Sequence, residues 1–217
     1  EVKYMTAKEE DILTSQNLIQ QGTVIDVLLQ SLIVDKTINV NELLIGDKNA
    51  IMVAARILGY GKDYEFEYDG VEQKVDLSKL NPVKIEFENS PKGVNEFSYV
   101  LPNSKRTITF KLLNGKDEKQ IESELKALRK ISKTQSSSLT TRLKKMILSV
   151  DGNSEKSFIN NFVDNEFLSR DSLVFRQYLT KITPDMDMTT TVNDSNGKET
   201  EVVIPITVRF FWPATGI

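Results

Sequence analysis

A pattern of elements that occurs twice is the feature that most constrains this chain. Residues 44–68 and residues 168–191 each contain an apolar-striped helical segment with an acidic start, then a Gly or Pro break, and then the alternating residues of a strand. Asp47 corresponds to Asp171, and the other matches in these segments keep the same spacing. Self-similarity of this kind is the sequence signature of a duplicated structural unit.

Earlier segments correspond in the same order. Residues 110–118 (FKLLNGKDE) align with residues 2–10 (VKYMTAKEE), although the spacing between matches grows along the chain, which indicates insertions in the second copy. The alternative interpretation is a chance similarity between two segments that both mix helices and strands. We favour duplication because the order of elements and several helix-capping acids agree together.

The prediction is an α+β fold made of two tandem copies of a strand, three-helix and β-hairpin unit, packed into one compact body. Residues 1–88 form the first copy, a helical unit plus a hairpin. Residues 89–217 form the second copy, a strand pair, a helical unit and a C-terminal hairpin. The turn-forming residues 89–96 mark the boundary between them. The expected helices span residues 7–20, 24–34 and 48–59, and the expected strands include 64–68, 71–77, 84–87, 97–101 and 107–113.

The expected elements follow from local patterns. Thr6 and Glu9 form a capping box for the first helix, and Asp47 is the expected N-cap of the third. Helical spacing predicts that Val27 points inward with the other apolar residues of its helix. Asp69-Gly70 is the typical two-residue turn of a hairpin.

Composition excludes several classes of chemistry. The 217 residues include no Cys and no His, which excludes disulfides, thiolate nucleophiles, Cys/His zinc sites and histidine bases. The net charge of −3 gives no general attraction to nucleic acid or to anionic lipid. No apolar run reaches the roughly 18 residues of a membrane span, so we expect no membrane partner. The chain opens without Met and without a signal pattern, and we expect residues to precede Glu1.

Two acidic clusters each have a simpler interpretation than chemistry. Residues 9–11 (EED) would need a pocket and a raised pKa to act in catalysis, whereas at a helix N-terminus they complement the helix dipole. Residues 151–155 (DGNSE) resemble the start of a calcium loop, but Lys156 and Phe162 stand where an EF-hand needs Gly and Glu. We therefore predict no catalytic residue, no metal and no cofactor.

A basic stretch lies between residues 126 and 145. Its members are Lys126, Arg129, Lys130, Lys133, Arg142, Lys144 and Lys145. The stretch could contact phosphate or an acidic protein, but no aromatic residues are interleaved for base stacking. A solvated helix face is the preferred interpretation, and nucleic-acid binding is the alternative.

The C-terminal aromatic run and the two hairpin turns are the candidate interaction sites. Aromatic residues are enriched at protein interfaces, and they also close hydrophobic cores, so two interpretations of the run remain open: an interface, or the core of the second copy. Asp-Gly and Asn-Gly turns place exposed tips at equivalent positions of the two copies. The candidate interface residues are Phe210, Phe211, Trp212, Asp69, Gly70, Asn196 and Gly197.

Three segments carry a family resemblance. Residues 5–15 (MTAKEEDILTS), 45–61 (IGDKNAIMVAARILGYG) and 204–213 (IPITVRFFWP) together resemble the baseplate hub subunits of T-even-type contractile-tailed bacteriophages and their marine relatives. The likeness covers nearly the whole chain in the same order. It implies a role in the phage tail, and it does not imply catalysis.

The resemblance also implies a difference. Relatives often have Cys-x-x-Cys pairs on the two hairpins, which suggests small zinc-ribbon-like knuckles. The corresponding tips here, residues 68–71 (YDGV) and 193–197 (NDSNG), contain no thiol ligand, so the implied metal does not carry over. Tight turns could hold these hairpins by backbone geometry alone.

Three functional hypotheses follow. The first is a non-enzymatic structural subunit of the baseplate hub that contacts other hub or tail proteins, including the tape-measure protein. The second is a transient chaperone of tail or baseplate assembly that leaves before the virion is complete. The third is a nucleic-acid-binding module that uses residues 126–145. The expected location is the tail baseplate of the virion, or the host cytoplasm during assembly.

Overall fold

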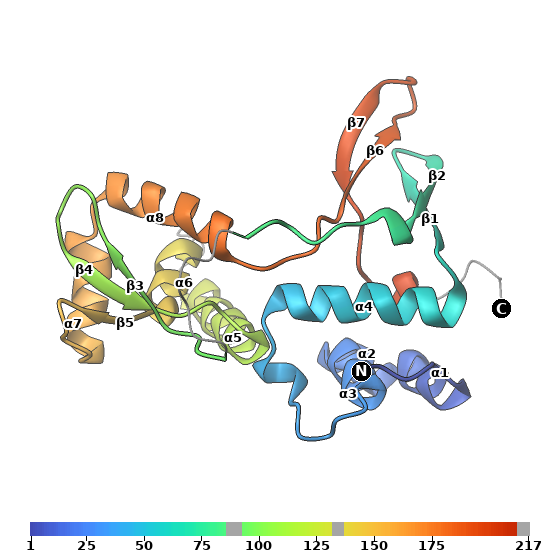
Figure 1. The fold of residues 1–217 in the computed structure, drawn as a ribbon, viewed down its shortest axis with the longest axis horizontal. Coiled ribbons are helices and arrows are strands. Elements are labelled where there is room, and N and C mark those ends of the chain that lie inside the picture. The colour runs from blue at the N-terminus through green and yellow to red at the C-terminus, as the bar shows by residue number, and fades with distance from the viewer. Residues whose placement is uncertain (86–92, 132–136, 212–217) are drawn as a thin grey trace. The chain divides into compact units, whose positions relative to one another are not determined.

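The computed structural model describes residues 1–85, 93–131 and 137–211. Helices account for 50% and strands for 21% of the chain, which confirms a mixed α+β fold. The chain divides into two compact units (Figure 1). We call Glu1–Val83 together with Asp185–Ile217 unit 1, and Lys84–Pro184 unit 2.

Four helices form one part of unit 1: α1 (Ala7–Thr14), α2 (Gln16–Gln21), α3 (Val24–Leu32) and α4 (Ile45–Tyr60). The predicted capping box at the start of α1 is present. The predicted first helix is interrupted at Ser15, whose extended backbone separates α1 from α2. Asp47 is not the N-cap of α4, because that helix begins two residues earlier and Asp47 lies in its first turn.

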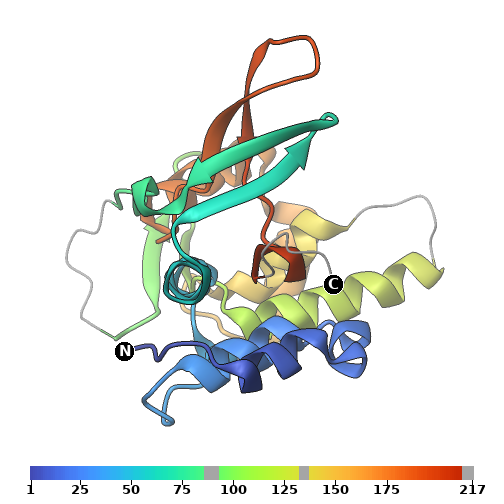
Figure 2. The ribbon, with the colours of Figure 1, turned by 90° about the vertical axis from the view of Figure 1, so that its right-hand side faces the viewer.

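Two antiparallel hairpins form the other part of unit 1. They are β1 (Asp63–Tyr68) with β2 (Val71–Asp76), and β6 (Thr189–Asn193) with β7 (Glu199–Val203). Within unit 1, the hairpins lie on one side of α4 and the helices α1–α3 on the other, as both Figure 1 and Figure 2 show. Single turns of 3-10 helix occur at Val40–Glu42, Leu77–Lys79 and Val208–Phe211.

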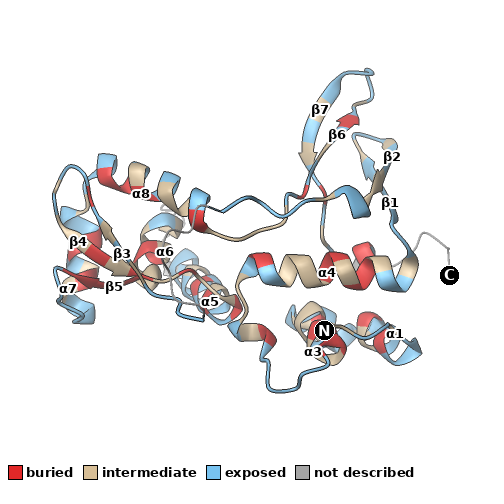
Figure 3. Cartoon of the chain, viewed as in Figure 1, coloured by how far each residue is buried: buried red, intermediate tan, exposed pale blue. Residues whose placement is uncertain are grey.

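The core of unit 1 joins these helices to residues from both ends of the chain. Leu28, Leu29 and Leu32 of α3 are fully buried, together with Phe210 and Phe211 near the C-terminus. Figure 3 shows the buried residues within the unit and the exposed surface of the hairpin ends. Val27, predicted to point inward, is 37% exposed because it lies on the face of α3 away from Leu28 and Leu32.

Unit 2 is built on a three-stranded antiparallel sheet in the order β3 (Phe97–Val100), β4 (Thr107–Phe110) and β5 (Ile147–Val150). Its helices are α5 (Gly115–Ile131), α6 (Ser138–Met146), α7 (Lys156–Asn161) and α8 (Ser169–Ile182), with a π-helical turn at Phe162–Glu166. Phe110 and Phe175 meet edge to face in its core, with ring centroids 4.9 Å apart. The predicted hairpin of strands 97–101 and 107–113 is therefore present in shortened form.

In each unit, a lysine just before the first helix contacts an acidic residue in the first turn of that helix. In unit 1, Lys3 Nζ lies 2.8 Å from Glu9 Oε1, and Glu9 occupies the third position of α1. In unit 2, Lys111 Nζ lies 2.7 Å from Asp117 Oδ2, near the start of α5. Both acids also accept a backbone hydrogen bond from the residue three positions earlier.

The segments before these helices also pair in the same way. In unit 1, Val2 forms an antiparallel bridge with Ile33, and the Lys3 amide donates to the Leu32 carbonyl at 3.0 Å. In unit 2, Phe110 pairs antiparallel with Ile147, and the Lys111 amide donates to the Met146 carbonyl at 2.9 Å. In both units, therefore, an extended segment crosses the end of a later helix, α3 or α6, before it enters α1 or α5.

The compact units are not the predicted copies, residues 1–88 and 89–217, because the C-terminal hairpin packs within unit 1. The division into copies concerns a duplication and stays a prediction. The last strand among the described residues, β7, ends at Val203. Lys84 and Ile85 are not in a strand, and the rest of the predicted strand 84–87 lies outside the described residues.

Candidate functional site

The two predicted hairpin tips contact each other. Asp69, in the turn between β1 and β2, accepts hydrogen bonds from Ser195 in the turn between β6 and β7, at 3.0 Å from the backbone nitrogen and 2.5 Å from Oγ. Farther down, Gln73 Nε2 donates to the Asn193 carbonyl at 2.8 Å. We call this arrangement the joined hairpin tips. The structure thus brings together two predicted sites that are far apart in the sequence.

Local turn chemistry positions both tips. Asp69 and Gly70 have φ angles of 51° and 74°, as a two-residue hairpin turn requires. The Asp69 side chain therefore lies at the turn itself. In the second turn, Asp194 Oδ1 accepts from the backbone nitrogens of Asn196 and Lys198 at 2.8 and 2.9 Å. Gly197 adopts a φ of 77°. Both turns are therefore fixed before any partner binds.

The outward faces of the hairpins are acidic. On the first hairpin, Glu65 lies opposite Lys74 and their charges are 3.6 Å apart, whereas Glu67 lies directly opposite Glu72. Like charges placed directly opposite each other destabilise a strand pair. No cation among the described residues forms an ion pair with Glu67 or Glu72. On the second hairpin, Glu199 and Glu201 are also exposed.

Two residues of the aromatic C-terminal run lie in the core instead of on the surface. Phe210 and Phe211 are fully buried, and the Phe210 ring meets the Tyr64 ring edge to face with centroids 4.9 Å apart. The rings close a hydrophobic core, as one of the two interpretations expected, but this is the core of unit 1, which also includes residues of the predicted first copy such as Tyr64. Trp212 lies outside the described residues.

The basic stretch is partly neutralised by ion pairs. Arg142 forms a two-point contact with Glu118, with nitrogen–oxygen distances of 2.6 and 2.7 Å. Lys144 lies 2.6 Å from Asp164, and Lys126 pairs with Glu122 along α5. Lys133 lies outside the described residues. These pairs lower the net positive charge that phosphate would meet, which disfavours the nucleic-acid alternative.

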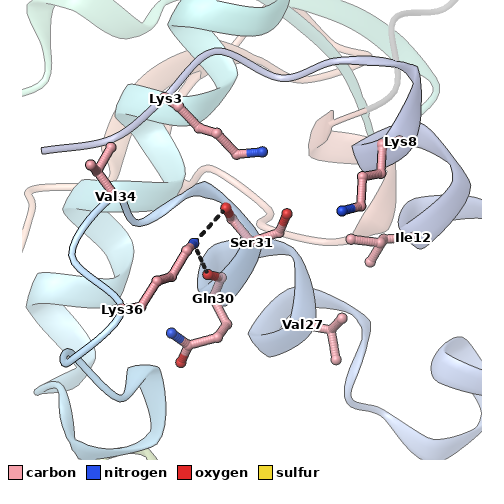
Figure 4. Close-up of a pocket in the computed structure, with 8 residues that line it drawn as sticks. All are labelled: Lys3, Lys8, Ile12, Val27, Gln30, Ser31, Val34 and Lys36. Atoms are coloured by element: carbon pink, nitrogen blue, oxygen red, sulfur yellow. Dashed lines mark hydrogen bonds between the residues drawn. The ribbon is translucent and has the colours of Figure 1, made fainter.

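An open groove of about 690 Å³ lies on the helical side of unit 1 (Figure 4). Its wall combines lysines with branched apolar side chains: Lys3, Lys8, Lys36, Ile12, Val27 and Val34. Val27 and Val34 are 37% and 46% exposed, so the groove offers apolar surface to a partner. Sequence reasoning missed this groove because its residues come from four short segments whose relative positions depend on the fold.

The lysines of the groove differ in the groups to which they bind. Lys3 pairs with the buried carboxylate of Glu9, which also accepts from Ser31 Oγ at 2.6 Å. Lys36 donates to three main-chain carbonyls at the end of α3, at 2.6 to 3.2 Å, and two of these bonds are drawn in Figure 4. Among the described residues, neither Lys36 nor Lys8 forms an ion pair. The groove therefore retains positive charge in a chain of net negative charge.

Two buried carboxylates are held ionised by their hydrogen bonds. Burial by itself raises the pKa of Glu9, but the bonds from Lys3, Ser31 and Thr6 outweigh it and hold the pKa well below its usual range. Burial likewise opposes ionisation of Asp171, but bonds from the residues at 103 and 104 lower its pKa to about 2. Asp171 is fully buried and accepts from both backbone nitrogens of that loop at 2.8 and 2.9 Å. Both acids thus serve to fix loops and helix ends.

The remaining acidic candidates are also engaged in local structure. Asp151 accepts from the Thr107 amide at 2.8 Å and pairs with Arg106 at 3.2 Å. Within residues 1–85, 93–131 and 137–211, no group of three or more His, Cys, Asp or Glu side chains is placed to hold a metal ion.

Comparison with protein-family models, with curated protein sequences and with solved structures gives no significant match for this chain. In the part of the chain that the structure describes, no helix combines the length and apolar character needed to cross a lipid bilayer.

Proposed function

We propose that this chain is a non-enzymatic structural subunit of the baseplate hub of a T-even-type contractile-tailed phage. In this proposal it acts through contacts with other hub or tail proteins. The resemblance of residues 5–15, 45–61 and 204–213 to that family supports the assignment. The joined hairpin tips are the observation that carries it, because they give the chain a preformed, exposed surface made from two sequence regions.

The joined hairpin tips are preorganised for binding a partner. A surface that is already fixed in the free protein loses little conformational entropy when a partner binds. The contacts from Ser195 to Asp69 and from Gln73 to Asn193 hold one hairpin against the other, so neither tip has to be ordered on binding. Exposed backbone and polar atoms of the turns then supply the contacts to a neighbouring subunit.

We also propose that the chain arose by tandem duplication. The matched contacts of Lys3 with Glu9 and of Lys111 with Asp117 support this, as do the matched antiparallel crossings at Ile33 and Ile147. In each copy a hairpin follows the last long helix, α4 or α8. Duplication would explain why the proposed contact surface consists of two similar hairpins.

Affinity capture from phage-infected cells tests the functional proposal. Asn196→Arg places a long charged side chain at the joined hairpin tips, and Asn81→Arg makes the same change at an exposed position elsewhere in unit 1. We expect the wild-type chain and Asn81→Arg to capture baseplate proteins, and Asn196→Arg to lose them. Equal capture by both variants would rule out the tips as the contact surface. Wild-type chain that captures no tail protein would contradict the functional assignment.

A further inference from the structure

The groove on the helical side of unit 1 has two lysines without an ion pair among the described residues, which favours an acidic occupant, although Lys36 already donates to carbonyls at the end of α3. Lys3 has Glu9 as its counter-charge, but Lys8 and Lys36 have no carboxylate partner among the described residues. The apolar side chains of Ile12, Val27 and Val34 line the same groove. A partner that fits this surface therefore has carboxylates whose aliphatic stems, or whose neighbouring side chains, cover the apolar part of the groove.

The first hairpin carries the opposite charge in a matching arrangement. Glu67 and Glu72 face each other across the strand pair, at the end of the hairpin next to the turn. This pairing is unfavourable in the free chain, and a cation placed between the two carboxylates would relieve it. Tyr68 and Val71, the next residues toward the turn, are partly buried and lie on the opposite face of the hairpin, because successive strand residues alternate in face.

The geometry of unit 1 prevents a chain from filling its own groove. The hairpins lie on one side of α4, whereas α1 and α3, which line the groove, lie on the other side (Figures 1 and 2). The joined hairpin tips of another molecule can approach the open groove, and the face of β1–β2 that carries Glu67 and Glu72 is exposed there.

We infer that the groove of one copy of this chain receives the end of hairpin β1–β2 of a second copy. Glu67 and Glu72 then approach Lys8 and Lys36, and the aliphatic stems of the two glutamates cover apolar area of the groove. Because the two surfaces differ, the contact is head-to-tail, and repetition closes a ring or extends a filament. This inference is independent of the proposed role in a phage tail.

Sedimentation velocity of the full chain tests the contact. We expect concentration-dependent association in low salt that weakens in 0.5 M salt, because partly exposed ion pairs are screened. Lys8→Glu alone and the double variant Glu67→Lys/Glu72→Lys should each weaken association on the order of tenfold or more. A single monomeric species at all concentrations in low salt would overturn the inference.

Mixing the two variants provides the sharper test. Each variant alone sets like charges against each other, but in the mixture the acidic groove meets the basic hairpin and the unchanged groove meets the unchanged hairpin. Association should therefore return in the mixture. Lys79→Glu and the double variant Glu199→Lys/Glu201→Lys are the matched controls, since they make the same changes in charge at exposed positions outside the proposed contact. Failure of the mixture to associate, or equal weakening by the controls, would refute the assigned surfaces.

Discussion

The carboxylate of Asp69 receives both polar hydrogens of Ser195, at 3.0 Å from the backbone nitrogen and 2.5 Å from Oγ. These two residues are 126 positions apart in the sequence. Each lies in the turn of a different hairpin, so this contact, together with that of Gln73 with Asn193, joins the two tips into a single surface.

A double-mutant cycle measures this coupling. Asp69→Gly removes the carboxylate and keeps the positive φ of 51° without strain, and Ser195→Ala removes the hydroxyl. We expect each change to lower the free energy of unfolding, and the two effects to be less than additive because both remove the same contact. Denaturant unfolding gives these values, and hydrogen exchange at the Ser195 amide should accelerate in Asp69→Gly. Strictly additive effects and unchanged exchange would show that the tips are not coupled in solution.

Burial of Phe210 predicts a structural role for a residue in the family-like C-terminal segment. Phe210→Ala should lower the free energy of unfolding by about 4 kcal/mol, because it leaves a cavity beside Tyr64. Val203→Ala is the control, since Val203 is 69% exposed and its truncation should cost about 0.5 kcal/mol or less. Chemical denaturation of both variants checks the prediction. Similar small losses for both would mean that Phe210 is not in the core.

Asp171 predicts a specific pH dependence of stability. Its pKa is about 2 in the folded chain against 3.8 ordinarily, so its contribution is fully present above the ordinary value and is lost as pH falls toward 2. Asp171→Asn should lower the free energy of unfolding by about 2 kcal/mol at pH 7 and by less at low pH. Unfolding titrations of the two proteins between about pH 5 and pH 2 make the comparison. A difference that stays constant over that range would contradict the folded-state contacts of Asp171.

The division into units predicts which fragments fold. Residues 84–184 contain their own sheet, helices and buried aromatic rings, so this fragment should give a helical circular dichroism spectrum and a cooperative thermal transition. The fragment 89–217 should instead expose Phe210 and Phe211, because their core partners belong to residues 1–83. Dye binding to exposed apolar surface and aggregation would report this exposure. A monomeric, cooperatively folded 89–217 fragment that is as stable as 84–184 would refute the division.

Local features of this fold were predictable because they depend on neighbouring residues. The Asp69-Gly70 turn, the capping box of Thr6 and Glu9, and the antiparallel pairing of β3 with β4 are each set within a few residues. The interruption at Ser15 was missed because an apolar pattern continues across it.

Long-range features were not predictable from one sequence. The contact of Asp69 with Ser195 and the burial of Phe210 against Tyr64 both join distant segments, and periodicity does not specify which segments pack together. The groove was missed for the same reason, since Lys8 and Val34 come to line one groove only when α1 packs on α3. The pattern that predicted Val27 as a core residue identified an apolar position but not the side of the helix that the core would cover.

Quantitative mass spectrometry of purified phage particles that carry this sequence tests the central proposal most directly. The account predicts that the chain is present in mature particles, in fixed proportion to other baseplate proteins. Absence from mature particles, combined with co-purification of the chain with tail proteins in infected cells, would contradict a structural subunit and indicate an assembly factor that leaves.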